Sequence, residues 1–257
     1  MKICAYFRYV VLLALFVQGS AQAELADVIP RVKPSVVIVG YYKSTNSPRF
    51  SLRGTGFVVE NGNLAVTNAH VLMGPAEDPA GASLALQIRD SKGELQMRAA
   101  SVLEVDRVHD LALLRFEGAP VAALNLRDSK SVREGQSVAF MGFPIGGALG
   151  FSSVTHRAMV SSITAIVLPA ATGAQLTERS IRSLRDGSFD IFQLDGTAYP
   201  GNSGGPLFDA ETGEVVGIVN MVFVKGTKES AISQPSGISY AIPSNFVAQL
   251  LQRQKAN

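Results

Sequence analysis

A glycine-rich stretch, residues 199–207 (YPGNSGGPL), places a serine in a setting suited to acyl transfer. Glycines on both sides of Ser203 allow a sharp turn that can come close to a bound substrate. The backbone N–H groups of Gly201 and Ser203 could face one point, with Asn202 shaping the turn between them. Such donors stabilise an oxyanion, and each is worth about 3–4 kcal/mol. The stretch predicts Ser203 as a nucleophile and Gly201, Asn202 and Ser203 as an oxyanion hole, although by itself it also fits an ordinary turn.

A serine hydroxyl is a weak nucleophile, so it needs a base that a third group orients. The chain has three histidines, His70, His109 and His156. His70 follows the apolar, strand-like segment 64–67 on a short turn, whereas His156 lies in a region of loop-like composition. We therefore predict His70 as the base. Its alternative role is that of a core histidine with satisfied hydrogen bonds.

The orienting carboxylate should stand where an apolar strand begins, because burial strengthens its interaction with an imidazole. Asp110 opens the apolar run LALLRF, whereas Asp90 and Asp106 have more polar surroundings. Asp110 is thus the predicted third member of the site, and a carboxylate that caps a turn is the alternative.

Chain order separates the known arrangements of these three residue types. The G-x-S-x-G pattern at 201–205 also fits the nucleophile turn of α/β-hydrolases, in which the histidine follows the serine. No histidine follows Ser203, and only Asp27 precedes His70, where a subtilisin-like order needs its aspartate. The order His70, Asp110, Ser203 is that of chymotrypsin.

Short apolar segments alternate with turns along the rest of the chain. The Asn61-Gly62 pair between two such segments is a strong hairpin signal. Many short strands with little helical periodicity predict a β-barrel or β-sandwich. Residues 119–134 are the expected connection between two halves, and Ser244 begins a predicted terminal helix over 244–252.

Five segments together resemble the protease domain of the high-temperature-requirement (HtrA/Deg) serine proteases, a chymotrypsin-like family. They are TGFVV (55–59), VTNAHV (66–71), DLALL (110–114), GNSGGPL (201–207) and YAIPS (240–244). The resemblance covers roughly residues 28–251. It implies an all-β fold of two six-stranded, chymotrypsin-like barrels, about 28–125 and 135–243, with the C-terminal helix 244–252.

The same resemblance implies the activity and the partners. It implies a serine endopeptidase that acts on proteins or peptides, needs no cofactor and commonly forms a homotrimer. PDZ domains usually follow the protease domain in this family. The present sequence stops at Asn257, so substrate capture by a PDZ domain is not carried over.

Substrate selection is predicted from a position near the serine. Thr197 lies six residues before Ser203, and in chymotrypsin-like proteases that position forms the floor of the pocket for the residue before the cut. A carboxylate there selects Lys or Arg, and Thr197 carries no charge. With Val219 and Met221 as candidate walls, we expect cleavage after a small or medium apolar residue. Alternatively, Thr197 only packs beneath the turn.

Residues 1–23 have the features of a signal peptide. Lys2 and Arg8 give a positive start, residues 9–17 are apolar, and an A-x-A cleavage motif occupies 21–23. The apolar run is shorter than the ~20 residues of a membrane span. We expect cleavage after this motif, a mature domain over 24–257 that has no stable membrane span, and delivery to the periplasm or the cell exterior.

Removal of this segment also balances the charge. The chain has 23 basic and 21 acidic residues, and loss of Lys2 and Arg8 leaves 21 of each sign. This balance favours neither nucleic acid nor an anionic membrane as a partner. The single cysteine, Cys4, leaves too, so no disulfide is expected. Dispersed histidines without a cysteine cluster predict no metal site.

Two further functions stay open at this level. One is a chaperone-like or binding module on a protease scaffold, because fold alone does not fix function. The other is a protease held inactive until a partner or ligand binds. The glycine-rich loop 143–150 motivates the second, since the family resemblance suggests a regulatory loop there. This loop lacks the Gly-Lys-Ser/Thr ending of a phosphate-binding loop.

Overall fold

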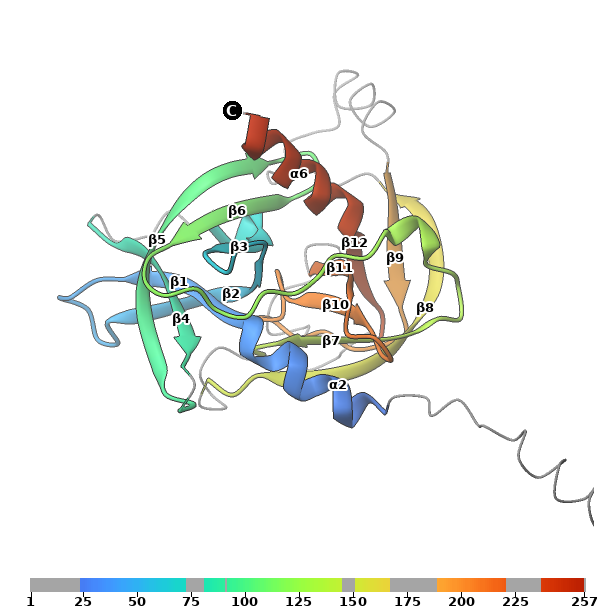
Figure 1. Ribbon diagram of the computed structural model, residues 1–257, viewed down its shortest axis with the longest axis horizontal. Coiled ribbons are helices and arrows are strands. Elements are labelled where there is room, and N and C mark those ends of the chain that lie inside the picture. The colour runs from blue at the N-terminus through green and yellow to red at the C-terminus, as the bar shows by residue number, and fades with distance from the viewer. Residues whose placement is uncertain are drawn as a thin grey trace, which may run out of the picture.

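Two closed barrels, each of six antiparallel strands, make up the described part of the chain (Figure 1). The computed structural model describes residues 24–72, 81–90, 92–144, 151–166, 189–220 and 237–256. The fold prediction, two six-stranded barrels with a C-terminal helix, is confirmed. The predicted signal peptide (1–23) and all but the first two residues of loop 143–150 lie outside the described residues.

The first barrel follows the strand order β1-β2-β3-β6-β5-β4. Its strands are β1 (Val36–Tyr42), β2 (Phe50–Val59), β3 (Leu64–Asn68), β4 (Ser83–Arg89), β5 (Leu95–Asp106) and β6 (Leu111–Phe116). Pairing of β1 with β4 closes it. The short helix α3 (Ala69–Leu72) follows β3 directly.

The second barrel repeats the topology of the first. Its strands are β7 (Ser137–Gly142), β8 (Val154–Ile166), β9 (Phe189–Leu194), β10 (Pro206–Asp209), β11 (Val215–Asn220) and β12 (Ser239–Pro243). Taken from β7, their order is β7-β8-β9-β12-β11-β10, which matches β1-β2-β3-β6-β5-β4 position by position. The two halves of the chain are therefore built on one plan, although no internal repeat is apparent in the sequence.

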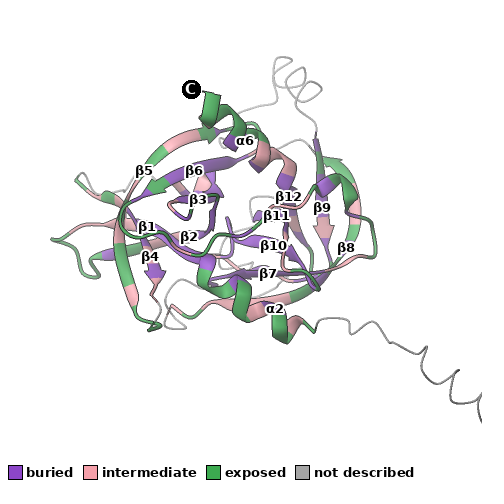
Figure 2. Cartoon of the chain, viewed as in Figure 1, coloured by how far each residue is buried: buried purple, intermediate pink, exposed green. Residues whose placement is uncertain are grey.

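Apolar side chains fill both barrels and the contact between them. One buried cluster includes Phe57 and Leu113 from the first barrel together with Met141 and Ile218 from the second. Burial of such a side chain contributes about 1.5–3 kcal/mol. Figure 2 shows that β3, β6 and β11 are buried along most of their length, whereas β5 is mostly exposed or intermediate. The interface thus fixes the barrels relative to one another through close packing.

Two helices cover the outside of the barrels. Helix α2 (Leu25–Val32) buries Val28 and Val32, and the 3₁₀ turn η1 (Lys33–Ser35) leads from it into β1. A Cβ on Gly213 would lie 3.0 Å from Val28, so a glycine there allows α2 to pack closely. Among the described residues, no helix is long and apolar enough to cross a membrane.

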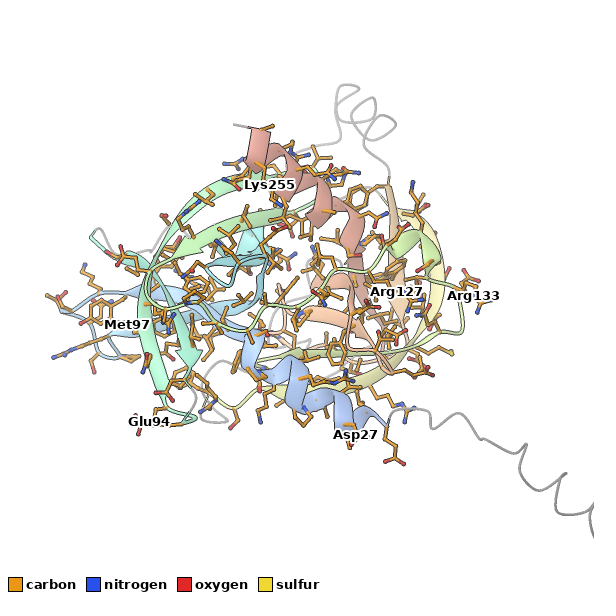
Figure 3. All side chains as sticks on the ribbon, viewed as in Figure 1. Asp27, Glu94, Met97, Arg127, Arg133 and Lys255 are labelled. Atoms are coloured by element: carbon orange, nitrogen blue, oxygen red, sulfur yellow. The ribbon has the colours of Figure 1, made fainter. Side chains whose placement is uncertain are left out.

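The C-terminal helix α6 (Ser244–Ala256) is longer than the predicted 244–252 and reaches both barrels. Besides its contacts with β11 and β12 of the second barrel, its last turn is held on the first barrel, because Lys255 pairs with Glu60 (2.9 Å) and Arg253 pairs with Glu104 (2.9 Å). Figure 3 shows Lys255 at this end of the helix.

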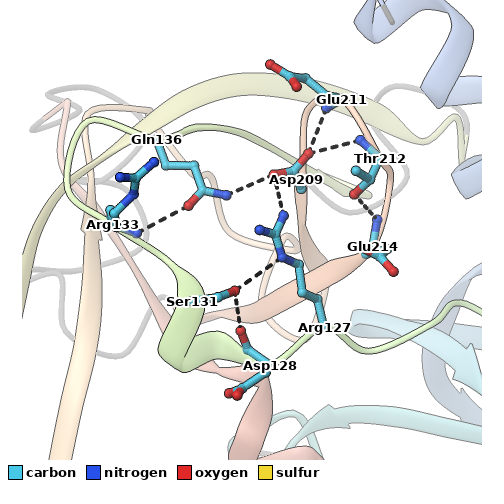
Figure 4. A network of polar contacts seen from close by, with 9 residues as sticks. All are labelled: Arg127, Asp128, Ser131, Arg133, Gln136, Asp209, Glu211, Thr212 and Glu214. Atoms are coloured by element: carbon cyan, nitrogen blue, oxygen red, sulfur yellow. Dashed lines mark hydrogen bonds and ion pairs between the residues drawn. The ribbon is translucent and has the colours of Figure 1, made fainter.

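The connection between the barrels is anchored on Asp209 at the end of β10 (Figure 4). This carboxylate accepts the N–H groups of Glu211 (3.0 Å) and Thr212 (2.9 Å), the amide of Gln136 (2.8 Å) and the guanidinium of Arg127 (3.0 Å). Burial opposes ionisation of Asp209, but these donors outweigh it, so its pKa lies below the ordinary value.

This network predicts how stability changes in acid. Because the folded-state pKa of Asp209 is depressed, its stabilisation is present above the unfolded value of about 3.9 and is lost as the pH falls below it. Replacement of Asp209 by Asn should lower the free energy of unfolding at pH 7 by roughly 1–3 kcal/mol and flatten its fall below about pH 4. Urea unfolding at a series of pH values measures both effects. Asp190→Asn, which removes an exposed carboxylate from β9, is the control, and an unchanged acid slope in Asp209→Asn would contradict the prediction.

Candidate active site

His70 and Asp110 lie side by side because their strands are paired. His70 is in α3, directly after β3, and Asp110 immediately precedes β6, with Asn68 opposite Leu111 in the sheet. The His70 Nδ1 atom is 2.5 Å from Asp110 Oδ2, and the His70 backbone N–H donates to Asp110 Oδ1 at 2.8 Å. The carboxylate thus fixes the imidazole through Nδ1, which leaves Nε2 as the nitrogen able to exchange a proton with substrate-side groups.

Asp110 itself is held from both barrels. Its φ of 52° is uncommon for a residue other than glycine, and its carbonyl is fixed by Asn68 Nδ2 (3.0 Å) and by the N–H of Ala69 (3.1 Å). Asn220, at the end of β11, donates its side-chain amide to Asp110 Oδ2 at 2.7 Å. The sequence reasoning missed Asn220. Its signal was a single polar residue at the end of an otherwise apolar strand, VVGIVN.

A second His–Asp pair stabilises the turn that leads to Asp110. Asp106 accepts the N–H (3.0 Å) and Nδ1 (2.9 Å) of His109 and the guanidinium of Arg253 (2.7 Å). Burial works against ionisation of Asp106, but these donors hold its pKa well below the usual range. The ring of His109 stacks on Phe246 of α6 at 3.9 Å. This pair therefore ties the Asp110 turn to the C-terminal helix.

The turn that carries Ser203 needs glycine at several positions. Gly201 and Gly204 have φ values of 104° and 85°, in the region that other residues rarely adopt. A Cβ on Gly201 would lie 2.2 Å from the Phe143 carbonyl oxygen, and one on Gly204 would lie 2.1 Å from that of Thr55. Gly201 and Gly204, which drew attention to this segment in the sequence, are thus required by its tight packing between the barrels.

Ser203 is held beside the segment that carries His70. Its carbonyl accepts the N–H of Thr55 at 2.9 Å. A Cβ on Gly54 would lie 2.9 Å from the Ser203 carbonyl oxygen and 2.8 Å from Val71, so the two segments meet at this glycine. No hydrogen bond of the described residues joins the Ser203 hydroxyl to His70. Catalytic hydrogen bonds are often long in the absence of substrate and tighten in the complex.

Within the described residues, the predicted oxyanion donors, the backbone N–H groups of Gly201 and Ser203, donate to no protein acceptor. The N–H of Asn202 instead donates to the Tyr199 carbonyl at 2.9 Å, so this residue shapes the turn between the two donors. Its side chain is fully buried beside Gly142, and neither of its amide atoms has a hydrogen-bond partner among the described residues.

The predicted pocket residues have different surroundings. Thr197 is half-buried and is followed by Ala198, whose N–H donates to the Ser239 hydroxyl at 2.7 Å. Val219 is fully buried in the second barrel, and its backbone carbonyl accepts the N–H of Gly204 at 3.0 Å. Met221 lies outside the described residues. The geometry therefore places Val219 behind the serine turn.

His156 lies in strand β8, so its assignment to a loop was wrong. It pairs with Phe140 across the sheet, and the two rings stack at 4.7 Å. Burial lowers the pKa of His156. Its ring is part of the packing of the second barrel. Over the described ranges, no group of three His, Cys, Asp or Glu side chains is arranged to hold a metal ion.

Comparison with known proteins defines the class of this domain. Residues 54–218 match the trypsin-like peptidase domain family, and the chain belongs to that family. The region spans the predicted trio, from within β2, two strands before His70, to within β11, two strands after Ser203.

Several of the similar proteins are serine proteases of the HtrA type. The chain is 29% identical over 240 residues to the mitochondrial serine protease HTRA2 of Drosophila grimshawi, covering 90% of this chain and 47% of that protein. The Drosophila virilis protein of the same name is also 29% identical, with 90% and 48% covered. The chain is also similar to a structure of the HtrA-type protease AlgW with a tripeptide, with a TM-score of 0.62 and 24% sequence identity. The match covers 89% of this chain and 62% of that chain. The chain thus spans about half the length of these HTRA2 relatives.

The contact between Asn220 and Asp110 generates a test of the site. A hydrogen bond to a charged group is worth roughly 1.5–3 kcal/mol, so Asn220→Ala should lower kcat about 10- to 100-fold with little change in KM. Steady-state kinetics on a peptide substrate measure the effect. Asn63→Ala, which removes an amide bound to the Gly118 carbonyl at the opposite ends of β3 and β6 from His70 and Asp110, serves as control. Unchanged kcat in Asn220→Ala would show that Asp110 does not depend on this donor.

Proposed function

We propose that this domain hydrolyses peptide bonds by acyl transfer through Ser203. The Ser203 hydroxyl attacks the substrate carbonyl and His70 takes its proton, while Asp110 stabilises the resulting imidazolium. The N–H groups of Gly201 and Ser203 bind the oxyanion. His70 then protonates the leaving amine, and a water molecule releases the acyl group in a second step. The observation that best supports this function is the His70–Asp110 pair, which is hydrogen-bonded through both carboxylate oxygens beside the serine turn.

The finer specificity proposed is cleavage after small or medium apolar residues of a protein or peptide. The uncharged Thr197 ahead of the serine turn supports it, as does the apolar composition of β11. Delivery to the periplasm or cell exterior after loss of residues 1–23, and assembly into a homo-oligomer, complete the proposal. Both rest on the sequence features and the family resemblance.

An active-site probe tests the reaction. A fluorophosphonate should label the wild type and fail to label Ser203→Ala, whereas Ser101→Ala on the exposed face of β5 should label normally. His70→Ala should lower kcat by at least about 10⁴-fold, because the trio acts as a unit. Absence of labelling in the wild type, even after peptides are added, would favour a binding module. Labelling only after peptides are added would indicate a protease held inactive.

Peptide profiling tests the specificity separately. In a library with one varied position before the cut, we expect Ala, Val and similar residues to give the highest kcat/KM. An uncharged pocket floor gives Lys and Arg side chains no partner for their charge, and an unpaired buried charge is costly. Mass spectrometry of the products identifies each cleavage site. Dominant cleavage after Lys or Arg would contradict the assigned pocket.

A further inference from the structure

Thr55, in β2 of the first barrel, contacts the serine turn through its backbone and its side chain. Its N–H donates to the Ser203 carbonyl (2.9 Å), and its hydroxyl donates to the Gly201 carbonyl (2.7 Å). The same hydroxyl accepts the N–H of Phe143 at 3.0 Å, and the Thr55 carbonyl accepts the hydroxyl of Thr67 at 2.7 Å. The side chain of Thr55 is fully buried. Each polar group of this residue therefore has a defined partner.

These contacts fix the peptide planes around the nucleophile. A peptide unit is rigid, so a hydrogen bond to its carbonyl also sets the direction of its N–H. In the peptide group that joins Gly201 to Asn202, the carbonyl is held by Thr55 and the N–H donates to the Tyr199 carbonyl at 2.9 Å. In the peptide group that joins Ser203 to Gly204, the carbonyl is again held by Thr55.

The peptide unit between these two carries the N–H of Ser203. Its carbonyl, that of Asn202, accepts the N–H of Gly205 at 2.9 Å. Thr55 thus holds the Gly201–Asn202 and Ser203–Gly204 peptide groups, which lie on either side of the Asn202–Ser203 peptide group that presents the Ser203 N–H. Gly201 and Gly204 bracket this segment, and glycine leaves a backbone free to rotate unless an outside contact restrains it.

We propose that Thr55 is a positioning residue that keeps the N–H groups of Gly201 and Ser203 aimed at the oxyanion. The inference rests on the acyl-transfer function proposed above. Loss of the hydroxyl leaves the Gly201 carbonyl without its donor and the Phe143 N–H without its acceptor. The peptide group that joins Gly201 to Asn202 is then oriented only by the hydrogen bond from its N–H to the Tyr199 carbonyl. Thr55 acts through the turn and touches no reacting atom.

Two substitutions separate the hydroxyl from the shape of the side chain. Thr55→Val keeps the shape and removes the hydroxyl, and it should lower kcat about 10- to 100-fold with KM unchanged. Thr55→Ser keeps the hydroxyl and should restore kcat close to the wild-type value. A kcat of Thr55→Val equal to that of the wild type overturns the proposal. Equal losses in the Val and Ser variants overturn it too, because they would assign the effect to packing.

Paired inhibitors supply a readout that a purely structural role would not give. A peptidyl aldehyde forms a hemiacetal with Ser203: a bond joins the serine oxygen to the aldehyde carbon, the carbonyl π bond opens onto the carbonyl oxygen, and the serine proton moves by way of His70 to that oxygen. The oxygen of this adduct occupies the oxyanion position. Thr55→Val should weaken aldehyde binding by the same factor as kcat, and it should leave binding of the matching peptidyl alcohol unchanged. Equal weakening of both inhibitors would place the damage in the substrate groove and overturn the proposal.

Ser244→Ala is the matched control, since its buried hydroxyl also donates to a backbone carbonyl, that of Arg127 (2.6 Å), at the start of α6. It should lower thermal stability and leave kcat unchanged. If Thr55→Val does not fold, Thr55→Cys replaces it, because a thiol is a weak donor. Its kcat should fall as well, and wild-type kcat in that variant overturns the proposal. Failure of acyl transfer itself would appear differently, as an inactive wild type that the fluorophosphonate does not label.

Discussion

The proposed reacting groups of this domain are divided between two barrels, so the candidate site depends on the polar contacts that join them. His70 and Asp110 belong to the first barrel, and Ser203 belongs to the second. Among the described residues, the hydrogen bonds that cross the boundary here include two from Thr55 to the serine turn, one from Phe143 to Thr55 and one from Asn220 to Asp110. They are short-range and directional. They keep their geometry only because the apolar packing between the barrels prevents relative movement.

The repeated topology explains why the site forms at this boundary. Each barrel supplies its parts from strand ends and the turns beside them: His70 after β3, Asp110 before β6 and Ser203 before β10. Strand interiors are occupied by core packing and by ladder hydrogen bonds, which leaves few polar groups for chemistry. Turns have free backbone groups and can adopt conformations such as that of Asp110. The barrels therefore act as rigid supports for a small number of specialised turns.

Sequence reasoning predicted the parts of the candidate site that have local signals. The glycines around Ser203 and the apolar strand after Asp110 each leave a pattern within a few residues, and chain order then selected the arrangement. Asn220 and the docking of α6 across both barrels left weaker patterns, because they depend on contacts between residues more than a hundred positions apart. His156 was misplaced because β8 begins among small and polar residues that look loop-like. Its burial comes from Phe140, its neighbour in the paired strand.

The site also contains features that are unfavourable on their own. The side-chain amide of Asn202 is buried without a partner among the described residues, and a buried polar group in that state costs about 1–3 kcal/mol. The left-handed backbone of Asp110 adds roughly 1–3 kcal/mol. Such unfavourable features persist only where several contacts with the surrounding structure hold them in place. Here the surroundings are the hydrogen bonds of Asn68 and Ala69 to the Asp110 carbonyl and the tight glycine contacts of the serine turn. The stability of the barrels thus maintains an arrangement that a short isolated segment would not adopt.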